Sequence, residues 1–308
     1  MKFMITGGAG SVGKSLTSSL LEKGHHVRVL DKKVEGLQSL KHKNLDLIEG
    51  GIEGLSVMKE AVKGIDIIVH LAWSFSDDPM ELLEGDLKGH LILLGEAVAA
   101  KVSHFIYTST AVVYGKPTGI PITEESPCLV EDARKPFYGV AKLMAEKVSL
   151  AYFKTKGLPV TIFRFWWSYG KEIGGRHLRD LIKLAKAGQP LAVPEGAGGS
   201  FLHLDDLTNA ILLALKKQEV FGEIFNLSTL FLTWEEIARI IIEVTHSSSQ
   251  LEIIPAKDWK GPAFLADAWE LSTAKAERIF AYRSLLSYQA ARQKLKEAIA
   301  RCYQDMMM

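Results

Sequence analysis

The stretch from Lys2 to Asp31, KFMITGGAGSVGKSLTSSLLEKGHHVRVLD, decides the fold. Its first apolar run, Lys2–Ile5, predicts a buried strand, and a glycine-rich turn at Gly7–Gly13 follows directly. Lys14–Lys23 then shows helical periodicity, and the β-branched run Val27–Asp31 predicts a second strand. A strand, a tight turn, a helix and another strand in this order are typical of the β-α-β unit of a parallel sheet.

The glycine turn matches two phosphate-binding motifs. Gly8, Gly10 and Gly13 match the dinucleotide pattern G-x-G-x-x-G. Gly8 and Gly13 followed by Lys14 and Ser15 also match the P-loop pattern G-x-x-x-x-G-K-[ST]. In both motifs the glycines let the backbone approach a phosphate, which lies at the positive end of the following helix.

The end of the second strand favours the dinucleotide interpretation. Asp31 comes eighteen residues after Gly13, where its carboxylate can accept hydrogen bonds from the adenosine ribose of NAD. A P-loop enzyme would need an acidic residue for magnesium after an apolar strand, whereas the strand Ile65–Val69 runs into His70. We therefore expect NAD, and NADP less because Asp31 would repel its 2′-phosphate, although Lys32 reduces that preference. A P-loop nucleoside triphosphatase is the less favoured alternative.

The rest of the chain continues the alternation of strands and helices. Further predicted strands are Leu45–Glu49, Ile65–His70, His104–Thr108 and Val160–Phe165. Further predicted helices are Leu55–Val62, Asp86–Ala100, Tyr138–Lys156, Asp205–Lys217, Trp234–Thr245 and Tyr288–Tyr303. From about Trp166 the rhythm loosens, and Pro194–Ser200 is expected to be a glycine-rich loop.

These patterns predict an α/β fold with a doubly wound parallel sheet. Residues 1–165 would form a Rossmann domain that binds NAD, and the segment 201–228 would return to it. Residues 166–200 and 229–308 would form a smaller C-terminal lobe that binds the substrate.

Composition excludes several classes of function. Of 308 residues, 47% are hydrophobic and 24% charged, which is typical of an ordered globular protein. The formal charge of +1 gives no field that would attract nucleic acid or an anionic membrane. Cys128 and Cys302 are in no metal-ligand spacing, and the nine histidines form no H-E-x-x-H cluster, so we expect no metal. No signal peptide or long apolar run is evident, and we expect a cytoplasmic protein.

A possible reaction centre lies further along the chain. Tyr138 and Lys142 are four residues apart, which places a phenol and an ammonium group on one face of a predicted helix. The pKa of a free tyrosine is about 10, and a neighbouring cation would lower it. Tyr138 could then remove a hydroxyl proton while hydride leaves the same carbon for a nicotinamide ring. The Y-x-x-x-K pattern often arises by chance, but a preceding turn with Pro136 and the upstream glycine turn strengthen it.

With these motifs in order, the chain resembles the extended short-chain dehydrogenase/reductase family, the NAD-dependent epimerases and dehydratases, over nearly its full length. The residues that carry the resemblance are Gly7, Gly10 and Gly13, His70-Leu71-Ala72, Tyr107 to Gly115, Tyr138 with Lys142, Arg164 to Gly170, and Phe201 to Asp206.

The resemblance implies roles for individual residues. Thr110 takes the catalytic Ser/Thr position, where its hydroxyl would bond the reacting oxygen, and Lys142 would hold the nicotinamide ribose and tune Tyr138. The expected cofactor-binding residues are Gly7, Gly10, Ser11, Val12, Gly13, Asp31, Lys32, Leu71, Ala72, Trp73, Thr108, Tyr138, Lys142 and Phe165. The expected substrate residues are Ser74, Phe75, Ala111 and Trp167. The resemblance also implies a homodimer that pairs through the helices 86–100 and 138–156.

The departures from the family pattern bear on the substrate. Ala111 and Val112 stand where dehydratases carry an Asp-Glu pair, which disfavours dehydration. Trp167 replaces a polar asparagine and makes the expected pocket wall more apolar. The arginine that often grips a sugar-nucleotide diphosphate is absent at Gly199 and Ser200, unless Arg176 or Arg179 substitutes for it. Asp86 stands in place of the usual asparagine, and Gly51 in place of an adenine-contacting aspartate.

We therefore expect an NAD-dependent oxidoreductase or epimerase acting on a hydroxyl-bearing carbon of a sugar, a sugar nucleotide or a related alcohol. The frequency of such enzymes in the family favours a nucleotide-sugar epimerase, whereas Trp167 and the missing arginine favour a dehydrogenase of a smaller or more apolar alcohol. A non-catalytic NAD-binding redox sensor is an alternative of another class, but such sensors typically lack the Tyr/Lys pair.

Overall fold

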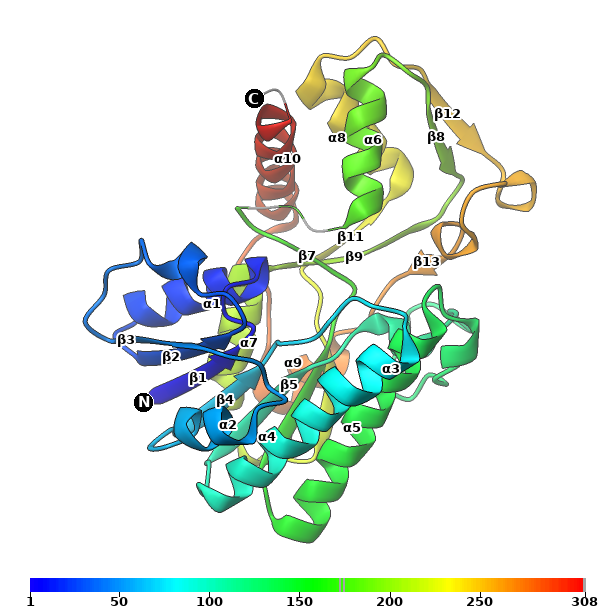
Figure 1. The fold of residues 1–308 in the computed structure, drawn as a ribbon. Helices are drawn as coiled ribbons and strands as arrows, with labels where there is room; N and C mark the ends of the chain where they lie inside the picture. Colours follow the sequence, from blue (N-terminus) through cyan, green and yellow to red (C-terminus); the bar gives the residue numbers. More distant parts are fainter. Residues whose placement is uncertain (172, 174, 307–308) are drawn as a thin grey trace.

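A seven-stranded parallel sheet forms the centre of the computed structural model, which describes residues 1–171, 173 and 175–306 (Figure 1). Its strand order is β10-β6-β5-β4-β1-β2-β3, so the chain winds outward in both directions from the middle of the sheet. The strands are β1 (Lys2–Thr6), β2 (His26–Asp31), β3 (Leu45–Glu49), β4 (Ile67–His70), β5 (His104–Thr108), β6 (Val160–Arg164) and β10 (Glu223–Asn226). The α/β fold with a doubly wound parallel sheet, expected from the sequence, is confirmed. Residues 172, 174, 307 and 308, within the predicted C-terminal lobe, lie outside the described residues.

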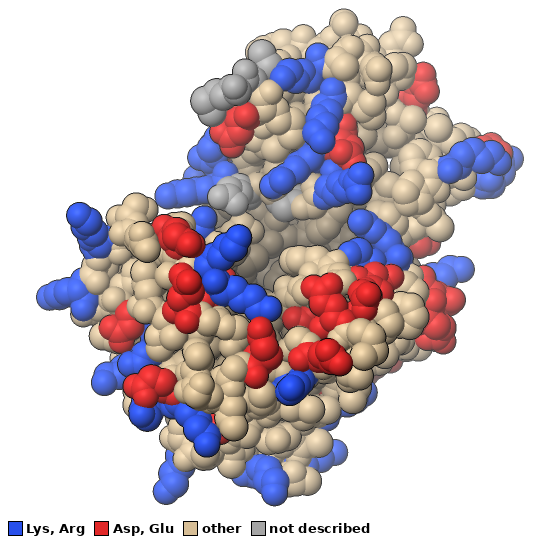
Figure 2. Space-filling view, viewed as in Figure 1, with Lys and Arg blue, Asp and Glu red and all other residues tan. Residues whose placement is uncertain are grey.

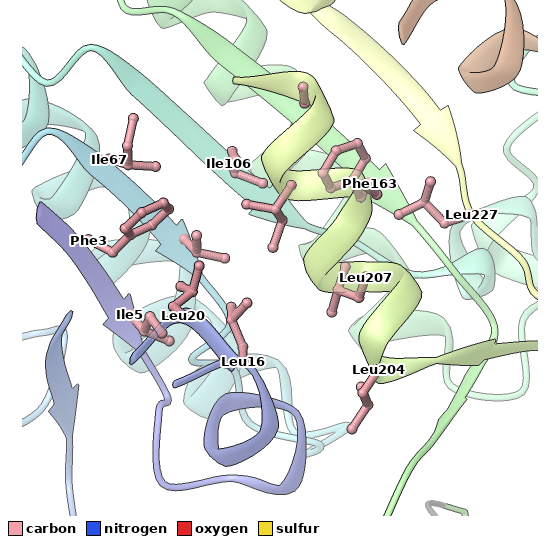
Figure 3. Packing of buried hydrophobic residues seen from close by; sticks show 14 of the residues in the cluster. Phe3, Ile5, Leu16, Leu20, Ile67, Ile106, Phe163, Leu204, Leu207 and Leu227 are labelled. Atoms are coloured by element: carbon pink, nitrogen blue, oxygen red, sulfur yellow. The ribbon is translucent and has the colours of Figure 1, made fainter. Parts of the chain in front are cut away.

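Helices cover both faces of this sheet because the strands are apolar on both sides. In β1, Phe3 and Ile5 point to one face and Met4 to the other, as the period of two requires. Figure 3 shows the first face, where Leu16 of α1 and Leu207 of α7 pack against the strands. The helices are α1 (Ser11–Glu22), α7 (Leu204–Ala214) and α9 (Ala274–Phe280) with the first cluster, and α2 (Leu55–Ala61), α4 (Lys88–Ala99) and α5 (Pro136–Lys156) with the second.

The second half of the chain builds a smaller lobe beyond one edge of the sheet (Figure 1). Its elements are β7 (Trp167–Tyr169), α6 (Arg176–Lys186), β8 (Leu191–Pro194), β9 (Gly198–His203), β11 (Leu230–Thr233), α8 (Trp234–Thr245), β12 (Leu251–Ile254), β13 (Ala268–Trp269) and α10 (Tyr288–Asp305). The lobe has its own core, in which Trp234, Ile241 and Leu295 are fully buried. Strand β10 and helix α7 interrupt this lobe in sequence and pack with the main sheet.

The expectation of a loop over Pro194–Ser200 is wrong at both ends, because Pro194 ends β8 and the last three residues belong to β9. Gly198–His203 forms β9, which pairs with β7, β11 and β13 and lies at the centre of a four-stranded sheet. Glycine usually weakens a strand, but here it serves packing. A β-carbon at Gly199 would lie 1.8 Å from the ring of Trp166, so only glycine lets this indole lie against the strand.

The predicted helix Asp86–Ala100 is part of a longer helical segment. Asp78 caps its start by accepting hydrogen bonds from the backbone N–H groups of Met80 and Glu81. The segment runs through α3 (Pro79–Glu81) and a π-helical turn, η2 (Leu82–Leu87), into α4. Turns of this kind are frequent at functional sites, and this one carries Asp86. Within the described part of the chain, no helix is long and apolar enough to cross a membrane.

Candidate active site

The glycine turn places its backbone against the segment that follows β4. Gly7 has a φ of +71°, and a β-carbon there would lie 2.7 Å from the backbone nitrogen of Ala72. At Gly13 a β-carbon would lie 2.3 Å from the carbonyl oxygen of Gly7, so the turn and the start of α1 require glycine at both positions. The turn, the first helix and the segment after β4 thus meet at the edge of the sheet formed by the carboxyl ends of its strands.

This edge fits the phosphates and ribose of a dinucleotide. Helix α1 begins after Gly10 with no side-chain cap and no acidic residue in its first turn, so its N–H groups at Ser11, Val12 and Gly13 are suited to an anion. Asp31 ends β2 beside the turn, where its Oδ2 accepts a hydrogen bond of 2.9 Å from the Ala9 N–H. A carboxylate next to an anion-binding helix terminus matches the donor and acceptor needs of NAD.

The segment after β4 is fastened to helix α5. Phe75 stacks on Tyr138, with ring centroids 5.9 Å apart and an interplanar angle of 19°. The Asp77 carboxylate accepts a hydrogen bond of 3.0 Å from the Tyr138 N–H, and Lys135 Nζ donates to the carbonyl oxygen of Phe75. Phe75 is 78% exposed, so it covers Tyr138 from the solvent side.

The predicted catalytic residues lie together where β5 ends. Thr110 follows β5, and its hydroxyl accepts a hydrogen bond of 3.2 Å from the Val112 N–H. Lys142 Nζ donates to the carbonyl oxygen of Thr108 at 2.9 Å and lies 4.3 Å from the ring centroid of Trp73. Thr110, Tyr138 and Lys142 are all buried. The carboxyl end of one strand and the first turns of α5 therefore bring a hydroxyl, a phenol and an amine to one place.

Burial is the largest influence on the pKa values of Tyr138 and Lys142. The pKa of Tyr138 is raised, first by burial and then by the charge of Asp86, and hydrogen bonding with Thr110 opposes the rise. Burial lowers the pKa of Lys142 to about 7, against the opposing charges of Asp86 and Glu146. The sequence led us to expect that a neighbouring cation lowers the pKa of Tyr138. In the structure burial is the largest influence on this pKa, and it acts in the opposite direction.

Asp86 is a buried carboxylate whose charge acts on both Tyr138 and Lys142. It is 7% exposed, and burial raises its pKa. Both of its oxygens accept hydrogen bonds from Ser74, at 3.0 and 3.1 Å from the backbone nitrogen and 2.6 Å from the hydroxyl. Ser74, expected to contact the substrate, is thus engaged with Asp86, and this carboxylate connects the π-helical turn to the segment that carries Phe75.

Stacked tryptophans form an aromatic cluster where the main sheet passes into the C-terminal lobe. Trp166 stacks on Trp167 at 4.6 Å and 26° and on Trp269 at 6.3 Å and 13°. Both indoles pack on Phe201 and Trp234, and Trp166 also packs against the buried cluster that contains Ala111. Trp167 stays the predicted substrate residue, and the neighbouring Trp166 is the indole that contacts the Ala111 cluster.

The remaining predicted residues are distributed around the same edge. Leu71 and Ala72 follow β4 directly, and the Phe165 carbonyl accepts a hydrogen bond of 2.9 Å from the Ala111 N–H. Lys32 is exposed and forms an ion pair with Glu53. Sequence reasoning missed Asp77, Glu53 and Trp166 as candidates because their contacts join segments that are distant or irregular in sequence.

Arg176 and Arg179 are at the start of α6, in the C-terminal lobe. They line a cavity of about 390 Å³ on α6 together with Gly175, Asp180 and Lys183. Arg176 is 3.7 Å from the Asp180 carboxylate, and Arg179 donates to the carbonyl oxygen of Ile173. In the space-filling view the surface is hollowed between the two parts of the molecule, and basic side chains border the hollow (Figure 2). None of the residues lining the cavity belongs to the predicted site.

Comparison with known proteins identifies the family of the chain. Residues 3–228 match the model of the NAD dependent epimerase/dehydratase family. The chain belongs to this family. As an epimerase/dehydratase family member, it is 31% identical to a UDP-N-acetyl-alpha-D-glucosaminuronate decarboxylase of Bacillus cytotoxicus, over 82% of this chain and 83% of the relative. It is 30% identical to a UDP-glucose 4-epimerase of Corynebacterium glutamicum, over 83% of this chain and 84% of the relative.

Solved structures of the epimerase/dehydratase family have the same fold. A dTDP-glucose 4,6-dehydratase of Streptomyces venezuelae, determined with NAD bound, superposes with a TM-score of 0.80 at 26% identity, covering 99% of this chain and 97% of that one. A UDP-glucose 4-epimerase of Thermotoga maritima superposes with a TM-score of 0.81 over the full length of both chains, at 22% identity. At 22% identity, the likeness to the Thermotoga maritima enzyme shows a shared fold only. The names of these relatives include decarboxylation, epimerisation and dehydration, so family membership alone does not fix one reaction.

Proposed function

We propose that this family member is an NAD-dependent oxidoreductase or epimerase that acts on a hydroxyl-bearing carbon of a sugar, a sugar nucleotide or a related alcohol. The observation that carries the proposal is the burial of Tyr138 beside Thr110 and Lys142 at the edge of the sheet where the glycine turn and Asp31 lie. We also propose that it acts in the cytoplasm.

Each of the three residues has a distinct task in this proposal. Burial raises the pKa of Tyr138, which favours its protonated form, so Tyr138 would donate a proton to an oxygen that gains negative charge and accept it again in the reverse direction. Thr110 orients the reacting oxygen through its hydroxyl. Lys142, whose pKa burial lowers to about 7, would hold the nicotinamide ribose and tune Tyr138. When bound, NAD would accept hydride from the substrate and could return it.

The same proposal assigns the cofactor to the main sheet and the substrate to the lobe. Residues 1–165 with 201–228 would hold NAD through the cofactor-binding residues named from the sequence. Strand β10 supports this division because it pairs with β6 in the main sheet. Residues 166–200 and 229–308 would bind the substrate. The core of the lobe supports that assignment, but α9, within 229–308, packs with the main sheet, and strand β9 of the lobe runs on to His203. Asp31 favours NAD over NADP in this arrangement.

The walls of the site bear on the substrate. Ala111 offers no acid or base next to Thr110, which disfavours elimination of water. The stacked indoles of Trp166 and Trp167 offer apolar surface suited to the faces of a sugar ring or another alcohol. Because the curated relatives include enzymes named for UDP-sugars, nucleotide sugars are the first compounds to test.

An exposed apolar surface supports self-association. On α5, Phe137, Val140 and Met144 are 51%, 48% and 45% exposed and recur at helical spacing. On the adjoining helical segment, Leu83 and Leu91 are also exposed. We propose that these five residues form the contact surface of a homodimer. Met144→Glu should convert the dimer to a monomer in light scattering, whereas Leu285→Glu, at an exposed leucine of the C-terminal lobe, should not. A monomeric parent protein would refute the proposal.

The proposed activity is tested by ligand stabilisation followed by turnover. NAD should raise the Tm more than NADP does, and ATP with magnesium should leave it unchanged. A panel of nucleotide sugars, free sugars and apolar alcohols should then give NADH formation or epimer interconversion. Stabilisation by NAD with no turnover on the panel would favour a non-catalytic sensor, and stabilisation by ATP with magnesium alone would reject the dinucleotide site.

A further inference from the structure

The turn after β3 lies directly beside the end of β2. The Gly50 N–H donates to the carbonyl oxygen of Asp31 at 2.8 Å, which continues the pairing of Asp31 with Glu49. The chain then turns tightly, and the Gly54 N–H donates to the carbonyl oxygen of Gly51 at 3.2 Å. Residues 51–54 are therefore fixed next to the proposed ribose-binding carboxylate.

Within this turn, the side chain of Glu53 folds back over Gly51. A β-carbon at Gly51 would lie 2.3 and 2.4 Å from the two carboxylate oxygens of Glu53. The Glu53 carboxylate thus occupies the space that a side chain at position 51 would take. Lys32, the residue after Asp31, is 3.3 Å from Glu53 Oε1, and this ion pair favours the folded-back orientation.

The strand order locates the adenine if the chain binds NAD as proposed. The phosphates would lie at the turn after β1, and the adenosine ribose at Asp31 after β2. Thr110 follows β5, and Tyr138 of α5 stacks on Phe75 in the segment after β4. Both strands lie on the opposite side of β1 from β2. The nicotinamide must extend toward them, so the adenine extends the other way, toward the end of β3 and the turn 51–54.

We propose that the Glu53 carboxylate accepts a hydrogen bond from the 6-amino group of the adenine. An ionised carboxylate has acceptors only, and the 6-amino group is a donor. Hypoxanthine, with an oxygen at this position, would instead face the carboxylate with a second acceptor. Glu53 is therefore a specificity residue for the adenine, positioned by Gly51 and Lys32. This inference rests on the proposed function because it requires NAD to bind at this edge.

The test compares NAD with nicotinamide hypoxanthine dinucleotide in calorimetric titrations of the full chain. The two ligands share both riboses, the diphosphate and the nicotinamide, so the ratio of their Kd values reports the purine alone. The wild-type protein should bind NAD about fivefold to tenfold more tightly, as expected for one hydrogen bond to a charged acceptor. Equal affinities would overturn the role of Glu53 and leave the proposed NAD binding intact. Failure to bind either ligand would overturn both.

Variants distinguish the effect of the Glu53 carboxylate on purine preference from a general effect on the fold. Glu53→Ala should bring the two Kd values within about twofold of each other. Glu60→Ala, which removes another exposed glutamate paired with a lysine, should keep the wild-type ratio. Gly51 has no positive φ, so Gly51→Asp in the Glu53→Ala background places a carboxylate in the same space and should restore the preference for NAD. An unchanged ratio in Glu53→Ala would refute the proposal.

Discussion

Asp86 accepts hydrogen bonds from both the backbone N–H and the hydroxyl of Ser74, and so connects the π-helical turn to the segment that covers Tyr138. Its charge also raises the pKa of both Tyr138 and Lys142. One carboxylate thus affects the geometry and the ionisation of the proposed centre.

Replacing Asp86 by asparagine tests the effect of its negative charge on the neighbouring pKa values. The amide keeps an acceptor for Ser74 but removes the negative charge, so the pKa values of Tyr138 and Lys142 should both fall. The pH dependence of kcat/KM should move to lower pH. Glu84→Gln changes an exposed carboxylate in the same turn and should leave the profile in place. A profile unchanged in Asp86→Asn would show that Asp86 acts only as a structural link.

Gly199→Ala tests the packing of the aromatic cluster. The added methyl group would meet the ring of Trp166, and we expect a loss of about 2–3 kcal/mol in the free energy of unfolding. Gly119→Ala is the control, because a β-carbon there has no neighbour within 4 Å. In a Trp166→Leu background most of the cost of Gly199→Ala should disappear. Equal costs in both backgrounds, measured by urea unfolding, would contradict the proposed contact.

The buried His104 should make the free energy of unfolding sensitive to acid pH. It is 2% exposed, its Nε2 lies 2.7 Å from the Thr161 hydroxyl, and burial lowers its pKa to about 4. The unfolded chain takes up this proton below about pH 6.5, and the folded protein only near its own pKa. Stability from this group is therefore lost as the pH falls from about 6.5 to about 4, by on the order of 3 kcal/mol.

Urea unfolding at several pH values in this range measures that loss. His104→Gln should weaken the fall in stability toward acid pH, whereas His42→Gln, at an exposed histidine, should reproduce the wild-type slope. If the slope of His104→Gln equals that of the wild type, the proton uptake has been assigned to the wrong residue.

The main sheet could be predicted from sequence because its strands are buried on both faces. The predicted run Val27–Asp31 lies within β2, and His104–Thr108 matches β5. Such strands read as continuous β-branched and aromatic runs, which local pattern alone identifies. The glycine turn is equally local, since its residues are adjacent in sequence.

The lobe and the finer parts of the site depend on distant contacts. Strand β9 reads as a glycine-rich loop until Trp166 is placed against Gly199. The stack of Phe75 on Tyr138 joins segments that are more than sixty residues apart. The π-helical turn at Asp86 has no periodicity distinct from that of an α-helix. No local pattern indicates these features, because packing between segments creates them.

The most direct test of the proposed centre is Tyr138→Phe, assayed with the fastest substrate from the panel. The variant should bind NAD with a Kd within about threefold of the wild type and lose about 10²- to 10⁴-fold in turnover, the usual contribution of a general acid or base. Tyr152→Phe, on the same helix, should keep full activity. Turnover of Tyr138→Phe within about tenfold of the wild type, with NAD binding retained, would contradict the account.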